Sequence, residues 1–150
     1  MVKINRKVEY ALMVLKLMSE RGHDELTTAR EVCDLFKTPF DTTAKVMQQL
    51  NLAAVLTSHK GVKGGYQLSC DLRQLSYLSL VELVEGKASM VDCNEGPCDL
   101  IHSCNISGPI KRFNAYLTGI LSSLSVHELV AQEDFSAIKS CPPLTPKELA

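Results

Sequence analysis

Three cysteines, Cys93, Cys98 and Cys104, lie within twelve residues in the spacing C-x4-C-x5-C. Gly96 and Pro97 stand between them and allow the loop to fold back on itself, so the three thiolates can converge. Soft thiolates bind iron–sulfur clusters, zinc or copper(I), and the C-x2-C turns typical of structural zinc are absent from this loop. The spacing therefore favours an iron–sulfur cluster, with either two or four irons, over zinc. Unligated thiols in a reducing compartment are the remaining alternative.

The other potentially reactive side chains give no sign of catalysis. Cys33 falls on the apolar stripe of a predicted helix and is expected to be buried, and Cys70 and Cys141 are isolated. The four histidines lie in separate segments without a nucleophile motif. The glycine-rich stretch at 61–65 lacks the following helix of a dinucleotide-binding site. We therefore expect a protein that is not an enzyme.

Composition is that of a globular chain with a charge asymmetry. Its 150 residues are 45% hydrophobic and 22% charged, with a net charge of −1. Residues 1–73 carry 11 basic and 8 acidic side chains, whereas residues 74–150 carry 5 and 9, so a mildly basic first half precedes an acidic second half. The amino end shows no secretory signal, and no apolar run approaches the ~18 residues of a membrane span. We expect a cytoplasmic protein without a membrane partner.

The first half contains the pattern of a helix-turn-helix. Apolar residues at helical spacing predict a helix over residues 5–21, and Thr28 opens a short helix as the first residue of a capping box with Glu31. A third helix begins at about Asp41. Its buried side is predicted at the four residues Thr43, Val46, Met47 and Leu50. Thr42, Lys45 and Gln48 then face away and can enter a major groove, although an ordinary solvated face has the same pattern.

A β-hairpin is predicted directly after these helices. Residues 55–69 place two short strands around a loop with three glycines, which we expect to supply positive-φ turns. Lys60 and Lys63 project at its tip and can meet phosphates or a minor groove. A hairpin that follows a helix-turn-helix is the wing of a winged-helix domain, which predicts a DNA-binding domain over residues 1–73.

The second half is predicted to bind the cluster and to dimerise. A capping box at Ser79–Glu82 opens a short helix that Gly86 closes, and the cysteine loop runs from about 89 to 107. The next helix carries a narrow apolar seam that requires a partner helix, made of Ile110, Phe113, Leu117, Ile120 and Leu124. Ser125 opens one more short helix, and residues 134–150 form a loose tail. Residues 74–133 thus comprise a cluster-binding loop and a dimerisation helix. The predicted fold is mainly α, with a small hairpin wing, a cysteine loop and a long dimerisation helix.

The order of these elements resembles a known family. The segments VEYAL, GVKGGYQL, LSLVELVEG and SVHELV, together with the cysteine triplet and the seam helix, resemble the IscR/NsrR family of iron–sulfur winged-helix transcription regulators over residues 1 to about 133. The resemblance implies a homodimer that holds one cluster per subunit, binds palindromic promoter DNA, and senses iron–sulfur status, nitric oxide or redox state. Cys93, Cys98 and Cys104 match the three cysteine ligands of the family.

The fourth cluster ligand is left open by the cysteine loop. On the first helix, Glu9, Met13 and Leu17 follow at four-residue steps along a second, partly apolar face that something should cover. In the resembling family this cover is the other subunit, and an acidic residue at the position of Glu9 completes the cluster. Glu9 is also an ordinary residue for a helix amino end, and His102, inside the loop, is a competing ligand.

Two other classes of function fit parts of the pattern. A small iron–sulfur electron carrier would use the cluster as its active group, although such clusters normally have four cysteines in close register. A zinc-stabilised dimeric adaptor would use the same loop without sensing. Metal and sulfide analysis of anaerobically purified protein separates these alternatives from a regulator.

Overall fold

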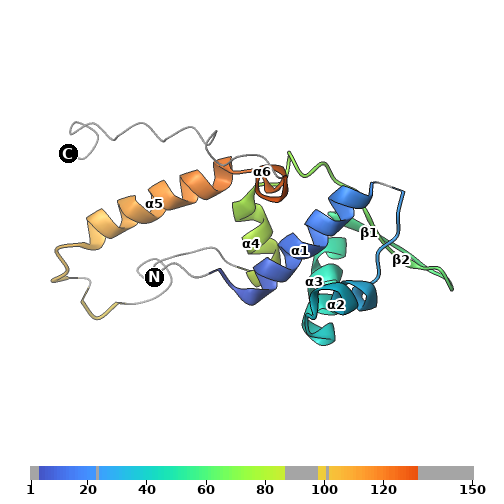
Figure 1. Ribbon diagram of the computed structural model, residues 1–150. Coiled ribbons are helices and arrows are strands. Elements are labelled where there is room, and N and C mark those ends of the chain that lie inside the picture. Colours follow the sequence, from blue (N-terminus) through green and yellow to red (C-terminus); the bar gives the residue numbers. More distant parts are fainter. Residues whose placement is uncertain (1–3, 23, 87–97, 101, 132–150) are drawn as a thin grey trace.

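The computed structural model describes residues 4–22, 24–86, 98–100 and 102–131. The amino-terminal part is a head of three helices and a hairpin: α1 (Arg6–Arg21), α2 (Ala29–Phe36), α3 (Phe40–Leu52), β1 (Leu56–His59) and β2 (Gly65–Leu68). Three helices follow: α4 (Tyr77–Glu85), α5 (Ser107–Ser123) and α6 (Val126–Val130). Figure 1 shows the hairpin projecting from one side of the head and α5 extending from the other. None of the described helices is long and apolar enough to cross a membrane.

The core of the head gathers around α1. Its buried side chains pack with apolar residues of the neighbouring elements. The core residues are Val8, Ala11, Val14, Leu15 and Met18 of α1, Val32 of α2, Val46, Met47 and Leu50 of α3, Leu56 of β1, Leu68 of β2, Leu80 and Val84 of α4, and Val126 and Val130 of α6. The predicted inward residues of α3 are confirmed. Val14 of α1 is fully buried, whereas Phe36 at the end of α2 is 41% exposed. The short α2 buries only Val32 completely and ends at Phe36, so its last turn does not reach the core.

The predicted wing is present as an antiparallel hairpin. Leu56 pairs with Leu68 and His59 with Gly65. Thr27, which precedes α2, adds a third short segment by exchanging two backbone hydrogen bonds of 2.9 Å with Tyr66. Of the loop glycines, only Gly61 has a positive φ, of 121°. Gly64 is required for a different reason than predicted, because a Cβ there would collide with the carbonyl oxygen of His59.

The start of α4 differs from the prediction. Its N-cap is Ser76, whose side chain accepts a hydrogen bond from the Ser79 backbone, so the predicted capping box at Ser79 is wrong. Ser76 also forms a β-bridge with Ser125, which ties the start of α4 to the start of α6. Tertiary pairing therefore fixes this helix end one turn earlier than the local motif. Gly86 ends the helix in the left-handed conformation, as predicted.

The last two helices differ in how they are packed. Among its described residues α5 has no buried side chain, and Phe113 and Ile120 of the seam are 55% and 37% exposed. By contrast α6 returns to the head, with Val126 and Val130 buried and with the predicted capping box between Ser125 and Glu128 present. The Lys16 ammonium of α1 donates to the carbonyl oxygen of Val130 at 3.0 Å, which caps the end of α6. The seam helix is thus joined to the rest of the protomer through α6 and through α4, whose Tyr77 N–H donates to the carbonyl oxygen of Leu124 at 2.7 Å.

Candidate functional site

The turn between α2 and α3 is held by side-chain hydroxyls. Lys37 adopts a left-handed conformation with φ of 56°, and its N–H donates to the carbonyl oxygen of Cys33. The Thr43 hydroxyl donates to the carbonyl oxygen of Pro39 at 2.9 Å and lies equally close to the Thr38 hydroxyl oxygen. Because Thr43 is fully buried, these contacts fix the direction in which α3 leaves the turn. Cys33, predicted to be buried, is half-buried and accepts a hydrogen bond from Thr38.

The outer face of α3 is polar. Lys45 and Gln48 are exposed and Thr42 is half-exposed, opposite the buried face of the helix. These three residues line a groove of about 320 Å³. The groove also includes Lys7 from the first turn of α1, which the sequence pattern did not single out. Its position depends on how α1 packs against α3, and nothing in the local sequence reports that packing.

The wing carries two lysines at its tip. Lys60 and Lys63 are exposed in the loop between β1 and β2. Across the strands, a ring nitrogen of His59 lies 2.8 Å from the side-chain oxygen of Gln67. The tip therefore carries two cationic groups on a hairpin whose strands are also linked by side chains.

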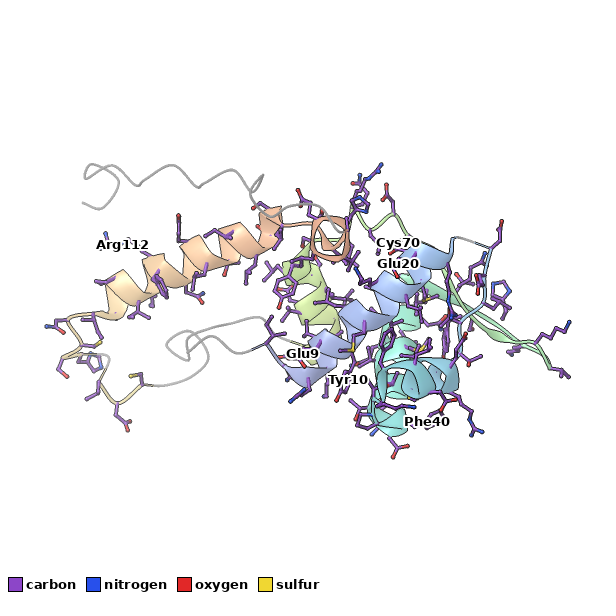
Figure 2. All side chains as sticks on the ribbon, viewed as in Figure 1. Glu9, Tyr10, Glu20, Phe40, Cys70 and Arg112 are labelled. Atoms are coloured by element: carbon purple, nitrogen blue, oxygen red, sulfur yellow. The ribbon has the colours of Figure 1, made fainter. Side chains whose placement is uncertain are left out.

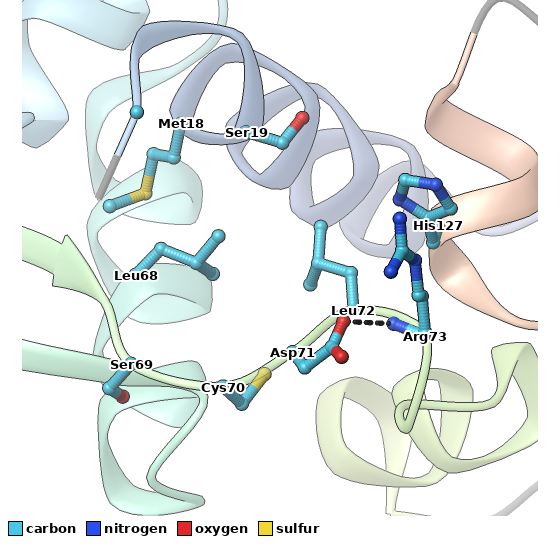
Figure 3. A pocket seen from close by; sticks show the side chains of 10 residues that line it. Met18, Ser19, Leu68, Ser69, Cys70, Asp71, Leu72, Arg73 and His127 are labelled. Carbon is cyan, nitrogen blue, oxygen red and sulfur yellow. Dashed lines mark hydrogen bonds between the residues drawn. The ribbon is translucent and has the colours of Figure 1, made fainter.

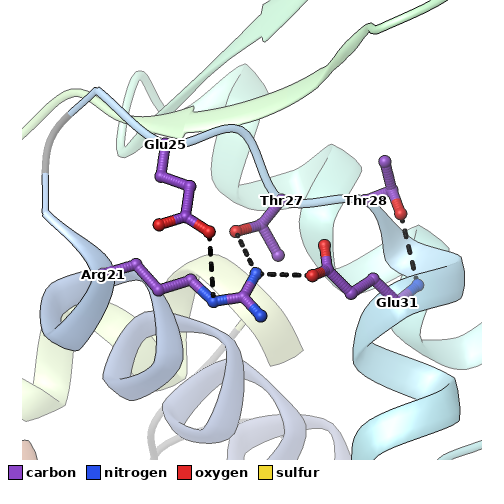
Figure 4. Close-up of polar contacts among 5 residues, drawn as sticks. All are labelled: Arg21, Glu25, Thr27, Thr28 and Glu31. Carbon is purple, nitrogen blue, oxygen red and sulfur yellow. Dashed lines mark hydrogen bonds and ion pairs between the residues drawn. The ribbon is translucent and has the colours of Figure 1, made fainter.

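Arg21 joins three elements of the head (Figure 4). One guanidinium nitrogen lies 2.7 Å from a carboxylate oxygen of Glu31, and a second lies 3.7 Å from Glu25. The guanidinium also donates to the Thr27 hydroxyl at 3.5 Å. Thr28 caps α2 as predicted, but the Glu31 carboxylate pairs with Arg21 rather than completing the predicted capping box. Arg21 thereby connects the end of α1, the start of α2 and the segment that pairs with the wing.

The predicted metal ligands are only partly covered by the described residues. Cys98 and Cys104 are free, half-buried thiols in the segment that leads into α5, whereas Cys93 lies outside the described residues, as does Cys141. Within the described ranges, no group of three histidine, cysteine or acidic side chains is gathered as a metal site. Glu9 lies near the beginning of α1 (Figure 2), and its carboxylate forms an exposed ion pair of 3.3 Å with Arg6. His102 is exposed.

A cleft of about 450 Å³ lies where α1, α6 and the segment after β2 meet (Figure 3). Its floor is formed by the buried side chains Met18, Leu68 and Leu72. Cys70, to which the sequence assigned no role, is half-buried in its wall. Burial, and secondly the negative charge of Asp71, raise the pKa of this thiol.

Known sequences include clear relatives of this chain. A sequence model of the Rrf2 family, described as iron-dependent transcriptional regulator, matches residues 4–132. The repressor NsrR of Streptomyces coelicolor is 30% identical over 119 residues, which cover 79% of this chain and 80% of NsrR. The regulator NsrR of Shouchella clausii is 21% identical and covers 89% of this chain and 91% of its own.

Solved structures agree on the fold. CymR, the global cysteine regulator of B. subtilis, aligns with a TM-score of 0.69 at 18% identity and covers 89% of this chain and all of its own. IscR of T. potens aligns with a TM-score of 0.66 at 11% identity, and the alignment covers 93% of this chain and 94% of the IscR chain. These relatives are regulators and not enzymes, and the predicted mainly α, winged-helix fold is confirmed. The chain belongs to the Rrf2 family of transcriptional regulators, with a winged helix-turn-helix head that binds DNA.

Proposed function

We propose that this chain is an iron–sulfur-dependent regulator that binds palindromic promoter DNA as a homodimer and senses iron–sulfur status, nitric oxide or redox state. The observation that carries the proposal is the exposed polar face of α3 beside the lysine-bearing wing, in a member of the Rrf2 family. A winged-helix head inserts its recognition helix into a major groove, and its basic hairpin contacts the backbone or the minor groove. In this proposal a reactive cluster regulates that contact.

On the DNA side, each group of residues has a distinct task. Thr42, Lys45 and Gln48 face the bases or the edges of the major groove, where hydroxyl, ammonium and amide groups can distinguish base pairs. Lys60 and Lys63 neutralise phosphates and supply affinity that is independent of sequence. Lys7, which shares the groove beside α3, adds a further cation at the same surface.

On the cluster side, Cys93, Cys98 and Cys104 are proposed as thiolate ligands and Glu9 as the fourth. The described residues fit such a group in their chemistry: Cys98 and Cys104 are free thiols, and the ion pair of Glu9 with Arg6 is solvent-exposed, so the Glu9 carboxylate can exchange partners at small cost. When bound, the cluster supplies a centre that reacts with oxidants and nitric oxide. Glu9 lies on α1, whose core face packs against α3, so a change of partner at Glu9 acts on the helix that supports the DNA-reading face.

Salt-dependent binding tests the DNA assignment. Replacing Lys63 by alanine should weaken binding to all sequences and reduce the slope of log affinity against log salt by about 1, because one phosphate contact is lost. Gln48→Ala should instead change the sequence preference and leave the slope nearly unchanged. If both variants lose the same amount of affinity on every DNA sequence, Gln48 does not read bases.

Iron and sulfide analysis of anaerobically purified variants tests the cluster. Cys98→Ser should abolish the visible absorbance and the sulfide content, whereas Cys33→Ser should keep both, since Cys33 lies in the helix-turn-helix. A Cys98 variant with full iron and sulfide would contradict the ligand assignment. Zinc without sulfide in the wild type would instead favour a structural adaptor. A cluster in a chain that binds no DNA would favour an electron carrier.

The fourth ligand is tested with a pair of alanine variants. Glu9→Ala should keep the dimer but give a more labile cluster with altered spectra, because a carboxylate ligand is lost. His102→Ala should leave the spectra unchanged. The reverse result would assign the fourth site to His102.

A further inference from the structure

The exposed face of α3 contains an acidic residue that the proposed DNA contacts do not use. Asp41 is exposed and stands four residues before Lys45 and seven before Gln48. On a helix these spacings stack the three side chains along one stripe. The stripe lies opposite the buried Thr43, Val46, Met47 and Leu50. Asp41 therefore shares the outward face of Lys45 and Gln48.

Asp41 also occupies the end of the helix that reads bases in this kind of domain. It is the second residue of α3, after Phe40, which Figure 2 shows at the start of the helix. Recognition helices contact base edges mainly with their amino-terminal residues. Within the described part of the chain, the Asp41 carboxylate has no hydrogen bond or ion pair. Its oxygens are thus available to a ligand at this surface.

A carboxylate here has an electrostatic cost. Phosphates repel it on every DNA sequence, so it lowers the affinity for DNA as a whole. One structural explanation is that an acidic residue stabilises the amino end of α3, where Pro39 makes no side-chain cap. The alternative is that a contact of the carboxylate with one base stabilises the complex by more than the repulsion from the DNA phosphates destabilises it.

Base chemistry identifies that base. In the major groove, cytosine presents the N4 amino group as a donor, whereas guanine presents two acceptors and thymine presents an acceptor and a methyl group. Adenine presents its N6 donor beside the N7 acceptor, and a carboxylate, which can only accept hydrogen bonds, would be repelled by N7. Building on the proposed DNA-binding function, we propose that Asp41 accepts a hydrogen bond from a cytosine amino group. Asp41 then selects a C·G pair at one position of each half-site and rejects guanine and thymine.

Selection from a pool of random double-stranded DNA tests this assignment and requires no defined operator. Full-length protein, purified anaerobically, is used as wild type, Asp41→Asn and Asp41→Ala. The wild type should select cytosine at one position of each half-site by about fivefold or more over other bases. Asp41→Asn should change the preferred base at that position to adenine, because an amide pairs with the adenine N6 and N7 atoms. Asp41→Ala should lose the preference there, keep the rest of the motif, and bind random DNA more tightly.

A charge-matched control is Glu82→Ala, which removes one exposed acidic group from α4 and should leave the selected motif unchanged. If both Asp41 variants select the wild-type motif, the base assignment is overturned, and a lower melting temperature in them would assign Asp41 to the helix end instead. A wild type that selects no motif would overturn the proposed function. A motif altered by Gln48→Ala but not by the Asp41 variants would overturn only the role of Asp41.

Discussion

Cys70 shows how a half-buried position controls the reactivity of a thiol. Its side chain lies in the cleft between α1, α6 and the segment after β2, next to Asp71. Burial disfavours the thiolate, and the carboxylate of Asp71 disfavours it further, so the pKa is raised. Since the thiolate is the nucleophile, this cysteine is held in its less reactive form near neutral pH.

Site-resolved alkylation checks this effect. With iodoacetamide near neutral pH, Cys70 should react more slowly in the folded protein than in the same peptide after proteolysis, and its rate should rise at higher pH than that of the peptide. Asp71→Asn removes the smaller cause of the raised pKa and should speed the reaction in part, whereas Asp24→Asn should not. Equal rates in folded protein and peptide, measured by mass spectrometry, would contradict the raised pKa.

For single residues, the sequence predicts the properties that depend on residue type and on the helical period. The outward direction of Lys45 and Gln48 follows from the buried residues of α3 and is confirmed. The assignment of the three cysteines as donors of a soft metal site stays a prediction. Lys7 and Cys70 could not be assigned in this way. Lys7 joins the α3 groove, and Cys70 lines a cleft with His127, only because segments far apart in sequence pack together.

At the scale of the elements, Arg21 links α1 to the start of α2 and to the segment that pairs with the wing. Its guanidinium is 21% exposed and contacts Glu31 at 2.7 Å, at the first turn of α2. Arg21→Gln should lower the free energy of unfolding by about 1 kcal/mol, the upper range for a partly exposed ion pair. It should also weaken DNA binding without changing the sequence preference, because α2 and the wing lose a common support rather than a base contact.

A double-mutant cycle with Glu31→Gln separates the ion pair from other effects of Arg21. In thermal or urea unfolding, the double variant should be less destabilised than the sum of the two single variants. Strict additivity would show that the pair contributes nothing. The Lys16–Glu20 pair, which is exposed and lies within α1, offers a control in which the coupling should be small.

Some helix ends are determined by nearby residues in the sequence, and others by contacts with distant segments. Thr28, Gly86 and the Ser125–Glu128 capping box follow local patterns and occur as predicted. The start of α4 does not, because Ser76 is held by its bridge to Ser125, almost fifty residues later in the chain. A pairing over that distance leaves no signal in the local sequence, and Ser79 presents an equally good motif.

In the whole molecule, the seam helix is connected to the head through α4, whose Tyr77 N–H donates to the Leu124 carbonyl oxygen, and through α6. The amino end of α6 donates backbone hydrogen bonds from Val126 to Leu75 and from His127 to Leu72, and its carboxyl end receives Lys16. The division of the chain at residue 73 remains a prediction. The existence of the seam helix follows from its apolar spacing, whereas the return of α6 to α1 does not.

The exposed seam leads to the prediction for assembly. Because α5 buries no described side chain within the protomer, its apolar stripe is free to pair with a second copy, and a two-fold dimer would present two heads to a palindromic site. Leu117→Asp places a charge in the middle of the stripe and should give monomers in sedimentation while the head keeps its melting temperature.

Ala115→Asp is the matched control, since it adds the same charge to an exposed position of α5 outside the seam and should leave the dimer intact. On palindromic DNA the Leu117 variant should bind about 100-fold more weakly, because the second head no longer binds at the effective concentration of a linked site. On a single half-site the two variants should bind equally. Dimers of Leu117→Asp in sedimentation would show that α5 pairs through another face or that a different element joins the subunits.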